Sequence, residues 1–205
     1  AGVRLPREGF LEALRKRCDE VGALLIFDEI QTGFGRTGEM FACVKYGVTP
    51  DIVCLAKALG GGMPLGAFVS SSEIMSTLSY SPVLGHITTF GGHPVCCAAG
   101  LAALNYIEAN DLHHKAEEKG AIFERGLADH PQVREIRRGG LLLAVELGAS
   151  EKLYKLMELF KEAGVMSDWF LYCDTAFRIS PPLTISEAEI EECCSIIRGC
   201  LDQLD

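Results

Sequence analysis

Two short apolar runs, each followed by an ionisable residue, dominate the hydrophobic pattern of the first half of the chain. Residues 23–27 lead into Asp28, and residues 52–56 lead into Lys57. Apolar runs of this length are typical of strands buried on both faces of a parallel sheet. Because ligands of open α/β sheets bind beyond the carboxyl ends of such strands, we predict that Asp28 and Lys57 face one crevice, as an acid and a base.

Other periodic segments complete the first half. A helix is predicted from Pro6 to Gly22, since Phe10, Leu14 and Cys18 follow helical spacing and glycine commonly ends a helix. A third apolar run covers residues 67–69, and a second long helix is predicted over residues 95–109. These elements indicate an α/β domain with a mostly parallel sheet.

The composition becomes more charged near Asn110, which predicts a domain boundary. Beyond it we expect a charged amphipathic helix, a hairpin around Gly139-Gly140, a helix containing Leu153, two further strands and a final helix that starts with a capping box at Ser186. The predicted organisation is therefore an α/β domain in residues 1–110 and a small C-terminal α+β domain in residues 111–205.

Composition excludes several classes of function. The 205 residues are 48% hydrophobic and 23% charged, as in globular proteins. A net charge of −9 argues against a nucleic-acid-binding surface. No apolar run approaches the ~18 residues of a membrane span, so we predict no membrane partner. The nine cysteines include no C-x-x-C pair, which favours a reduced, cytoplasmic location.

Three glycine-containing loops carry candidate chemistry. Gly33–Gly38 reads G-x-G-x-x-G, but it lacks the adjacent strand and the crossover helix of a dinucleotide-binding turn. Gly60–Gly62 follows Lys57 and allows a close backbone approach. Residues 88–92, Thr-Thr-Phe-Gly-Gly, precede a helix and fit either a phosphate cradle or an ordinary hydroxyl cap. His93 and Cys96 lack a second ligand pair, so we predict no metal.

Four motifs occur in a characteristic order: residues 28–38, DEIQTGFGRTG; residues 50–52, PDI; residues 57–62, KALGGG; and residues 89–92, TFGG. Together with residues 178–183, RISPPL, they resemble the class III aminotransferases, in particular the acetylornithine and ornithine aminotransferases. The resemblance implies an aspartate-aminotransferase-like fold (fold type I). Residues 1–110 would be the C-terminal part of a large domain that binds pyridoxal 5'-phosphate (PLP), and residues 111–205 the small domain.

The resemblance assigns roles around the cofactor. Lys57 would form the Schiff base with the PLP aldehyde and then move a proton on the substrate. Asp28 would pair with the pyridine nitrogen and keep the ring an electron sink. Gln31 would lie near the ring hydroxyl, and Thr89 would reach the phosphate of the neighbouring subunit. The last assignment implies a homodimer with shared active sites.

The resemblance also bears on substrates. Thr88 would contact the substrate, and Arg178 would hold a substrate carboxylate through a bidentate fork. The implied reaction transfers an amino group from an amine or amino acid of the ornithine, acetylornithine or 4-aminobutyrate type to a 2-oxo acid. Two alternatives stay open: an aminomutase or decarboxylase on the same scaffold, and a non-catalytic PLP-binding fragment.

Two departures from the family pattern leave the substrate open. Many members carry asparagine at the position of His93. Many members also carry a different pattern of small residues where this chain has Arg138-Gly139-Gly140. The family also has ~150–200 further upstream residues, about one more domain. That part would carry the glycine-threonine phosphate loop, a ring-stacking aromatic and a second arginine. We therefore expect the 205-residue chain alone to bind PLP weakly and to show no turnover.

Overall fold

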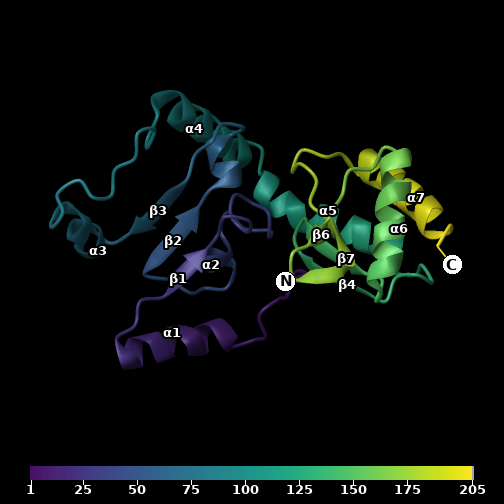
Figure 1. The fold of residues 1–205 in the computed structure, drawn as a ribbon, viewed down its shortest axis with the longest axis horizontal. Coiled ribbons are helices and arrows are strands. Elements are labelled where there is room, and N and C mark those ends of the chain that lie inside the picture. Colours follow the sequence, from purple (N-terminus) through teal and green to yellow (C-terminus); the bar gives the residue numbers. More distant parts are fainter. Residues whose placement is uncertain (205) are drawn as a thin grey trace. The chain divides into compact units, whose positions relative to one another are not determined.

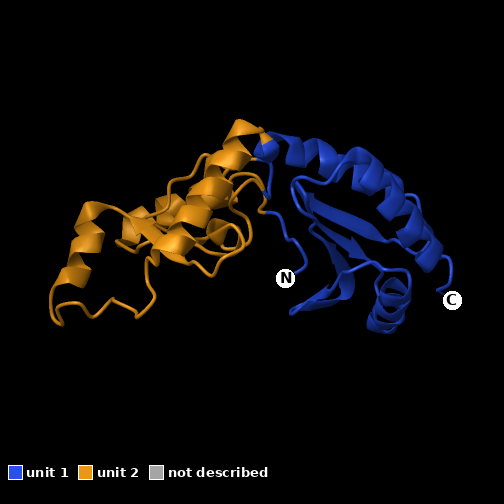
Figure 2. Cartoon of the chain, turned by 90° about the horizontal axis from the view of Figure 1, so that it is seen from above, with its two compact units in different colours: residues 1–5, 36–38, 112–205 blue, residues 6–35, 39–111 orange. Residues whose placement is uncertain are grey.

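The computed structural model describes residues 1–204, which form two compact α/β units (Figures 1 and 2). Unit 2 comprises residues 6–35 and 39–111. Unit 1 comprises residues 1–5, 36–38 and the chain from Leu112 onward. The predicted boundary after Asn110 lies one residue from the division between Asp111 and Leu112. The sequence pattern did not indicate that residues 1–5 and 36–38 belong to unit 1. The identities of large and small domain stay predictions.

The sheet of unit 2 has three strands in the order β1-β2-β3 (Figure 1). The strands β1 (Ile26–Asp28) and β2 (Ile52–Leu55) are parallel, and Asp28 lies opposite Cys54. The strand β3 (Ala67–Ser70) is antiparallel to β2. A parallel crossover needs about a dozen residues or more, and a connection of residues 56–66 does not reach this length. The sheet is therefore parallel only where it carries Asp28 and Lys57.

The helices of unit 2 are α1 (Phe10–Val21), α2 (Ala42–Lys45), α3 (Ser72–Ser76) and α4 (Pro94–Ala109), with short 3-10 turns η1 (Lys57–Gly60) and η2 (Thr77–Ser79). Helix α1 begins later than predicted from Pro6, after a left-handed Gly9, and ends at Gly22 as predicted. Helix α3 was not predicted, because a single turn leaves no periodic signal. Across residues 1–204, no helix combines the length and apolar character that crossing a membrane requires.

The glycine loop after Lys57 packs closely against α4. Gly61 has a left-handed φ of 56°, and a Cβ atom there would lie 2.5 Å from the carbonyl oxygen of Ala99 on α4. Gly100 lies on α4 itself, and a Cβ atom there would likewise lie too close to the carbonyl oxygen of Leu59. The close backbone approach expected of the glycine loop is therefore an approach to helix α4, and it fixes the segment that begins at Lys57.

The first strand of unit 2 is less buried than predicted. In the run of residues 23–27, Leu24 is 56% and Ile26 55% exposed, whereas residues 52–56 are buried or half-buried. The expectation of a strand covered on both faces was therefore wrong for the first of the two runs within the described chain. The apolar composition of a segment indicates that its side chains favour burial, but it does not indicate which other part of a protein packs over them.

Unit 1 contains an antiparallel sheet in the order β4-β5-β7-β6 with its helices packed on it. The strands are β4 (Glu135–Gly139), β5 (Leu142–Glu146), β6 (Trp169–Phe170) and β7 (Cys173–Ile179). The helices are α5 (Leu112–Leu127), α6 (Ser150–Glu162) and α7 (Glu187–Leu201). The predicted hairpin around Gly139-Gly140 is confirmed. The core between sheet and helices includes Phe123, Leu143, Val145, Phe160, Phe177, Ile190 and Ile197.

Helix α7 starts as its sequence predicts. The Ser186 hydroxyl accepts a hydrogen bond from the Glu189 amide, and the Glu189 carboxylate accepts one from the Ser186 amide, which forms the capping box. Cys194 and Cys200 of this helix lie in the core, and burial raises the pKa of Cys194 to about 11. Both act as small hydrophobic residues, as predicted.

Asp51 joins the beginnings of β1 and β2. Its Oδ2 accepts hydrogen bonds from the Leu25 amide at 2.6 Å and from Arg15 Nη1 on α1 at 2.7 Å. These two donors hold the pKa of Asp51 below its ordinary value. Asp51 therefore sets the register of the parallel pair at the end of the sheet opposite to Asp28 and Lys57.

We expect Asp51→Asn to lower the melting temperature at neutral pH by a few degrees, because the ionised carboxylate is lost. A folded pKa below the unfolded value of about 3.9 means that the contribution is present above that pH and lost as the pH falls through the folded pKa. Melting curves of both proteins at pH 7 and near pH 3 should show a gap that narrows in acid. A gap of equal size at both pH values would contradict this account.

Candidate active site

The structure places Asp28 and Lys57 at the same edge of the unit 2 sheet. Asp28 is the last residue of β1, and Lys57 follows the end of β2 after a single residue, Ala56. Because β1 and β2 are parallel, their carboxyl ends share one edge. The two residues thus occupy the edge where open α/β sheets bind their ligands.

Both side chains are available to a ligand. Asp28 is exposed, and within residues 1–204 its carboxylate accepts one hydrogen bond, from the Ile30 amide to Oδ1 at 3.0 Å. Lys57 is also exposed, and in the same part of the chain its ammonium forms no hydrogen bond or ion pair. Lys57 has a left-handed φ of 49°, which is uncommon for a residue other than glycine and typical of functional positions.

Glu29, the neighbour of Asp28, points in the opposite direction and is 1% exposed. Its carboxylate accepts hydrogen bonds from the Thr32 hydroxyl and from the amides of Ala42 at 2.9 Å and Cys43 at 2.7 Å. Those two amides begin α2 and have no partner within the helix. Glu29 therefore organises the loop between β1 and α2, a role that the sequence analysis did not assign.

We expect Glu29→Ala to destabilise the protein by roughly 2–6 kcal/mol, because two partly buried amides lose their acceptor and each such loss costs about 1–3 kcal/mol. Glu29→Gln keeps one acceptor oxygen and should cost less. Urea unfolding of both variants and the wild type measures the difference. Equal stability of Glu29→Ala and the wild type would show that the loop does not depend on this carboxylate.

The other predicted cofactor residues also lie in unit 2. Gln31 is exposed in the loop after β1, and Thr88 and Thr89 are exposed just before α4. The cap of α4 is His93, whose Nδ1 accepts a hydrogen bond from the Val95 amide at 3.3 Å. The alternative of a hydroxyl cap is therefore wrong, and the threonine hydroxyls are not used to begin the helix. The contact of Thr89 with a neighbouring subunit stays a prediction.

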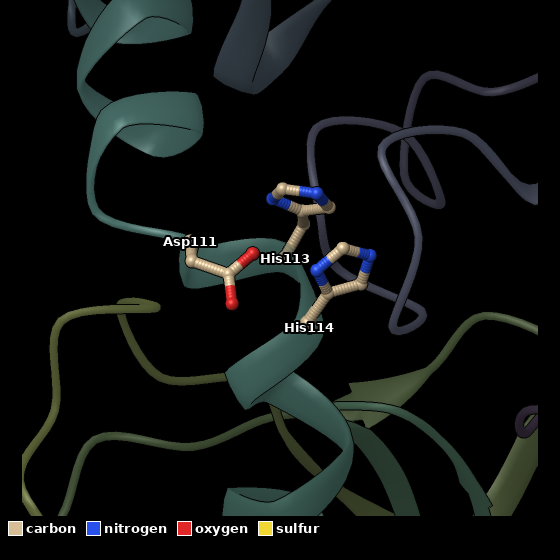
Figure 3. A group of neighbouring side chains, drawn as sticks. All are labelled: Asp111, His113 and His114. Carbon is tan, nitrogen blue, oxygen red and sulfur yellow. The ribbon is translucent and has the colours of Figure 1, made fainter.

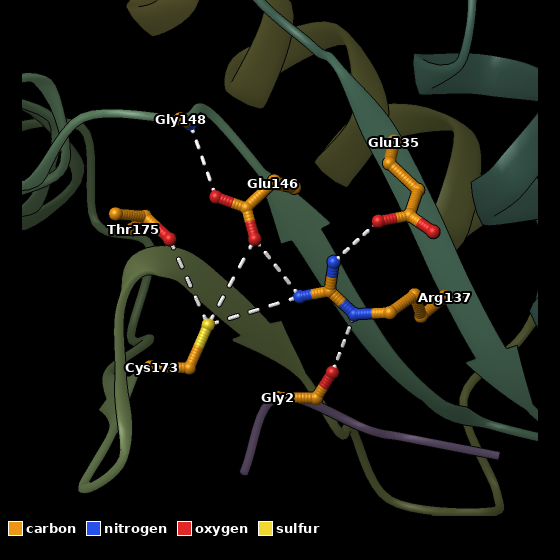
Figure 4. Close-up of polar contacts among 7 residues, drawn as sticks. All are labelled: Gly2, Glu135, Arg137, Glu146, Gly148, Cys173 and Thr175. Atoms are coloured by element: carbon orange, nitrogen blue, oxygen red, sulfur yellow. Dashed lines mark hydrogen bonds and ion pairs between the residues drawn. The ribbon is translucent and has the colours of Figure 1, made fainter.

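Two arginines flank Ala144 in unit 1, and they differ in their partners. The register pairs Arg137 of β4 and Arg178 of β7 with Ala144 of β5. Arg137 is 8% exposed, and its nitrogens donate to Glu135, Glu146 and the Gly2 carbonyl at 2.6, 3.0 and 2.6 Å (Figure 4). Arg137 is thus a fully paired structural cation.

Arg178 has no such partners. Its side chain is half-buried, and no hydrogen bond or ion pair of its guanidinium occurs within residues 1–204. Phe177 and Ile179 belong to the core under the helices, so the alternation of a strand places Arg178 on the opposite face of the sheet. An unpaired guanidinium on such a face is suited to bind a carboxylate through two hydrogen bonds.

Asp111, His113 and His114 form a group at the start of α5, and their potential ligand atoms lie within 4.8 Å of one another (Figure 3). The amino end of a helix carries partial positive charge, which disfavours a cation there. All three residues take part in other interactions. We therefore assign no metal to this group.

The comparisons with known proteins agree on one family. The chain matches the aminotransferase class-III family over residues 1–201. It is 46% identical to a putrescine aminotransferase of Pectobacterium atrosepticum over 209 residues, 99% of this chain and 44% of the relative. A transaminase from the marine bacterium Virgibacillus is 30% identical with a TM-score of 0.91, covering 98% of this chain and 50% of that structure.

An ornithine aminotransferase from Plasmodium yoelii is 32% identical with a TM-score of 0.86, covering 100% of this chain and 54% of that structure. The chain thus spans about half the length of the relatives that it matches. The fold is that of the PLP-dependent aminotransferases of fold type I, as predicted from the motifs. The chain belongs to the class III aminotransferases.

Proposed function

We propose that Asp28 and Lys57 are the ring-binding acid and the catalytic lysine of a PLP-dependent aminotransferase. One observation carries the proposal: the two residues lie at the carboxyl ends of adjacent parallel strands, exposed, each with a functional group available to a ligand. Membership of the class III aminotransferases supports it, since PLP is the cofactor of that family.

The side chains of unit 2 fit this cofactor. The Asp28 carboxylate has a free oxygen for the pyridine N–H, and the Lys57 amine is free for the aldehyde carbon. The exposed hydroxyl of Thr89 lies in the segment before the amino end of α4, where peptide N–H groups favour a phosphate. Gln31 would lie near the ring hydroxyl. When bound, PLP supplies an electron sink for the substrate carbon.

Each residue then has a defined task. Lys57 Nζ would accept the proton from the substrate carbon and donate it to the carbon of the cofactor's aldehyde group, as a general base followed by a general acid. The negative charge of Asp28 would hold a proton on the pyridine nitrogen. Arg178 would bind a carboxylate of the 2-oxo acid or amino acid, because its guanidinium is unpaired, and Thr88 would contact the substrate.

For the amino donor we propose an amine or amino acid of the ornithine, acetylornithine or 4-aminobutyrate type. The similarity to a putrescine aminotransferase adds a diamine to these candidates. We further propose a cytoplasmic homodimer with shared active sites. The match of Thr89 to the family's threonine that reaches the neighbouring subunit supports the shared active sites, and the nine cysteines without a C-x-x-C pair support the location.

The test is a half-transamination screen with ornithine, acetylornithine, 4-aminobutyrate, lysine and putrescine. It is performed on the 205-residue chain and on a protein of the relatives' length that contains it, and we propose turnover only in the latter. Exchange of the amino group with a 2-oxo acid supports the proposal. Decarboxylation or migration of the amino group would favour the alternative enzymes, and no reaction with any donor would favour a non-catalytic module.

A further inference from the structure

The loop that begins at Asp28 contributes residues to both units. Its base lies in unit 2, where the Gly33 amide donates to the Glu29 carbonyl at 3.0 Å and the Gly35 amide donates to the Met40 carbonyl at 3.2 Å. Its tip, residues 36–38, belongs to unit 1. Three residues of the G-x-G-x-x-G pattern, Arg36 to Gly38, therefore belong to unit 1, and the residues before them belong to unit 2.

Arg36 is the side chain that fixes this tip within unit 1. Its Nη1 donates to the carbonyl of Leu141 at 3.1 Å and to the carbonyl of Pro181 at 2.6 Å. The Leu141 amide donates back to the Arg36 carbonyl at 3.0 Å. Burial lowers the pKa of Arg36, and no carboxylate among residues 1–204 forms an ion pair with it. The charge of Arg36 is thus directed at two backbone carbonyls.

The tip packs against a turn that only glycine fits. Gly140 has a left-handed φ of 59°. A Cβ atom at this position would lie 2.5 Å from the carbonyl carbon of Thr37 and 2.7 Å from the carbonyl oxygen of Arg36. Both the backbone conformation and the space therefore require glycine at residue 140. The backbone of the loop tip consequently packs directly against the β4–β5 turn at Gly140.

The carbonyl of Pro181 matters because Pro181 follows the end of β7, the strand that carries Arg178. A second cation holds the same segment, since Lys119 Nζ on α5 donates to the Leu183 carbonyl at 2.7 Å. The backbone of Arg178 is fixed by the Asp168 carbonyl at 2.9 Å and the Ser167 hydroxyl at 2.7 Å. Arg36 is thus one of the residues that determine where the C-terminal end of β7 lies.

We propose that Arg36 is a positioning residue for substrate binding: by holding Pro181 it fixes the end of the strand that presents Arg178. The inference rests on the proposed function, in which Arg178 binds a substrate carboxylate. Loss of Arg36 should therefore impair the binding of carboxylates and spare amines that lack a carboxylate.

The test compares Arg36→Met with Arg198→Met in the PLP-loaded protein of the relatives' length that contains this chain. Arg198 is a matched control in the same unit, because its Nη1 also donates to two acceptors, the Gly126 carbonyl at 3.0 Å and Asp129 at 2.5 Å, but it lies on α7. In Arg36→Met the KM for a 2-oxo acid should rise roughly ten- to hundredfold. The half-reaction with a carboxylate-free amine such as putrescine should change less than about twofold. Arg198→Met should change neither value.

Hydrogen exchange of the backbone amides provides a readout that does not require turnover. In the chain without PLP, the amides of residues 178–180 and 183–185, which flank Pro181 and Pro182, should exchange faster in Arg36→Met and at the wild-type rate in Arg198→Met. Arg36→Lys, which retains a cation but lacks the planar guanidinium, should give intermediate values, and it replaces Arg36→Met in the test if that variant does not fold.

An equal loss with amine and 2-oxo acid, or unchanged exchange of the amides of residues 178–180 and 183–185, would overturn the inference. Absence of transamination in the wild type would instead refute the proposed function, while the exchange data still decide whether Arg36 fixes the β7 end. The two failures are therefore distinguishable.

Discussion

In a protein of the relatives' length that contains this chain, replacing Lys57 with alanine is expected to abolish the visible absorbance of lysine-bound PLP and to lower transamination by roughly 10⁴-fold or more. Covalent attachment of the cofactor and proton transfer both depend on this one amine, and general acid–base catalysis alone contributes about 10²–10⁴. Lys57 is suited to both tasks, because its ammonium is exposed and unpaired within the described chain. The absorption spectrum after addition of PLP and the steady-state rate measure the effect.

Lys16→Ala is the matched control for this experiment. Lys16 is an exposed lysine of α1 in the same unit, and its loss should leave both spectrum and rate unchanged. If Lys57→Ala kept the absorbance while Lys16→Ala lost it, the lysine assignment would be wrong. An unchanged spectrum in both variants would indicate that another lysine binds the cofactor.

Asp28→Asn is expected to reduce the half-reaction rate by about 10²–10³-fold while PLP remains attached to Lys57. Asparagine preserves the shape and a hydrogen bond from the Ile30 amide but removes the negative charge that holds a proton on the pyridine nitrogen. Stopped-flow measurement of the half-reaction, together with the bound PLP content, separates a slower reaction from a lost cofactor.

The neighbouring carboxylate provides the control for Asp28. Glu29→Gln should lower stability more than Asp28→Asn, because Glu29 is buried against three donors and Asp28 is exposed with one. A change at Asp28, as an exposed position, should stay within about 0.5 kcal/mol of the wild-type stability. A large loss of stability in Asp28→Asn without a kinetic effect would assign Asp28 a structural role instead.

The features that could be predicted from the sequence are those encoded by neighbouring residues. The positions of Asp28 and Lys57 follow from two apolar runs and the rule for strand ends, and the capping box at Ser186 follows from a four-residue pattern. Such signals depend on segments of a few residues, so they can be recognised without knowledge of the fold.

The features that could not be predicted depend on distant partners. Arg36 donates to carbonyls 105 and 145 residues away, and nothing near Arg36 in the sequence indicates either. Arg137 and Arg178 both stand in strands, yet only the register and the carboxylates around Arg137 distinguish a paired cation from an unpaired one. The inward direction of Glu29 likewise depends on where α2 begins.

The distribution of residues between the units has a consequence for modularity. Unit 1 includes residues 1–5 and 36–38, so a protein that begins at Leu112 would lack the Gly2 carbonyl that binds Arg137 and the guanidinium that binds Pro181. The C-terminal unit is therefore not an exchangeable module. A chimera that grafts residues 112 onward onto another α/β unit would have to import the loop tip Arg36–Gly38 as well, so we expect the two units to be inherited together.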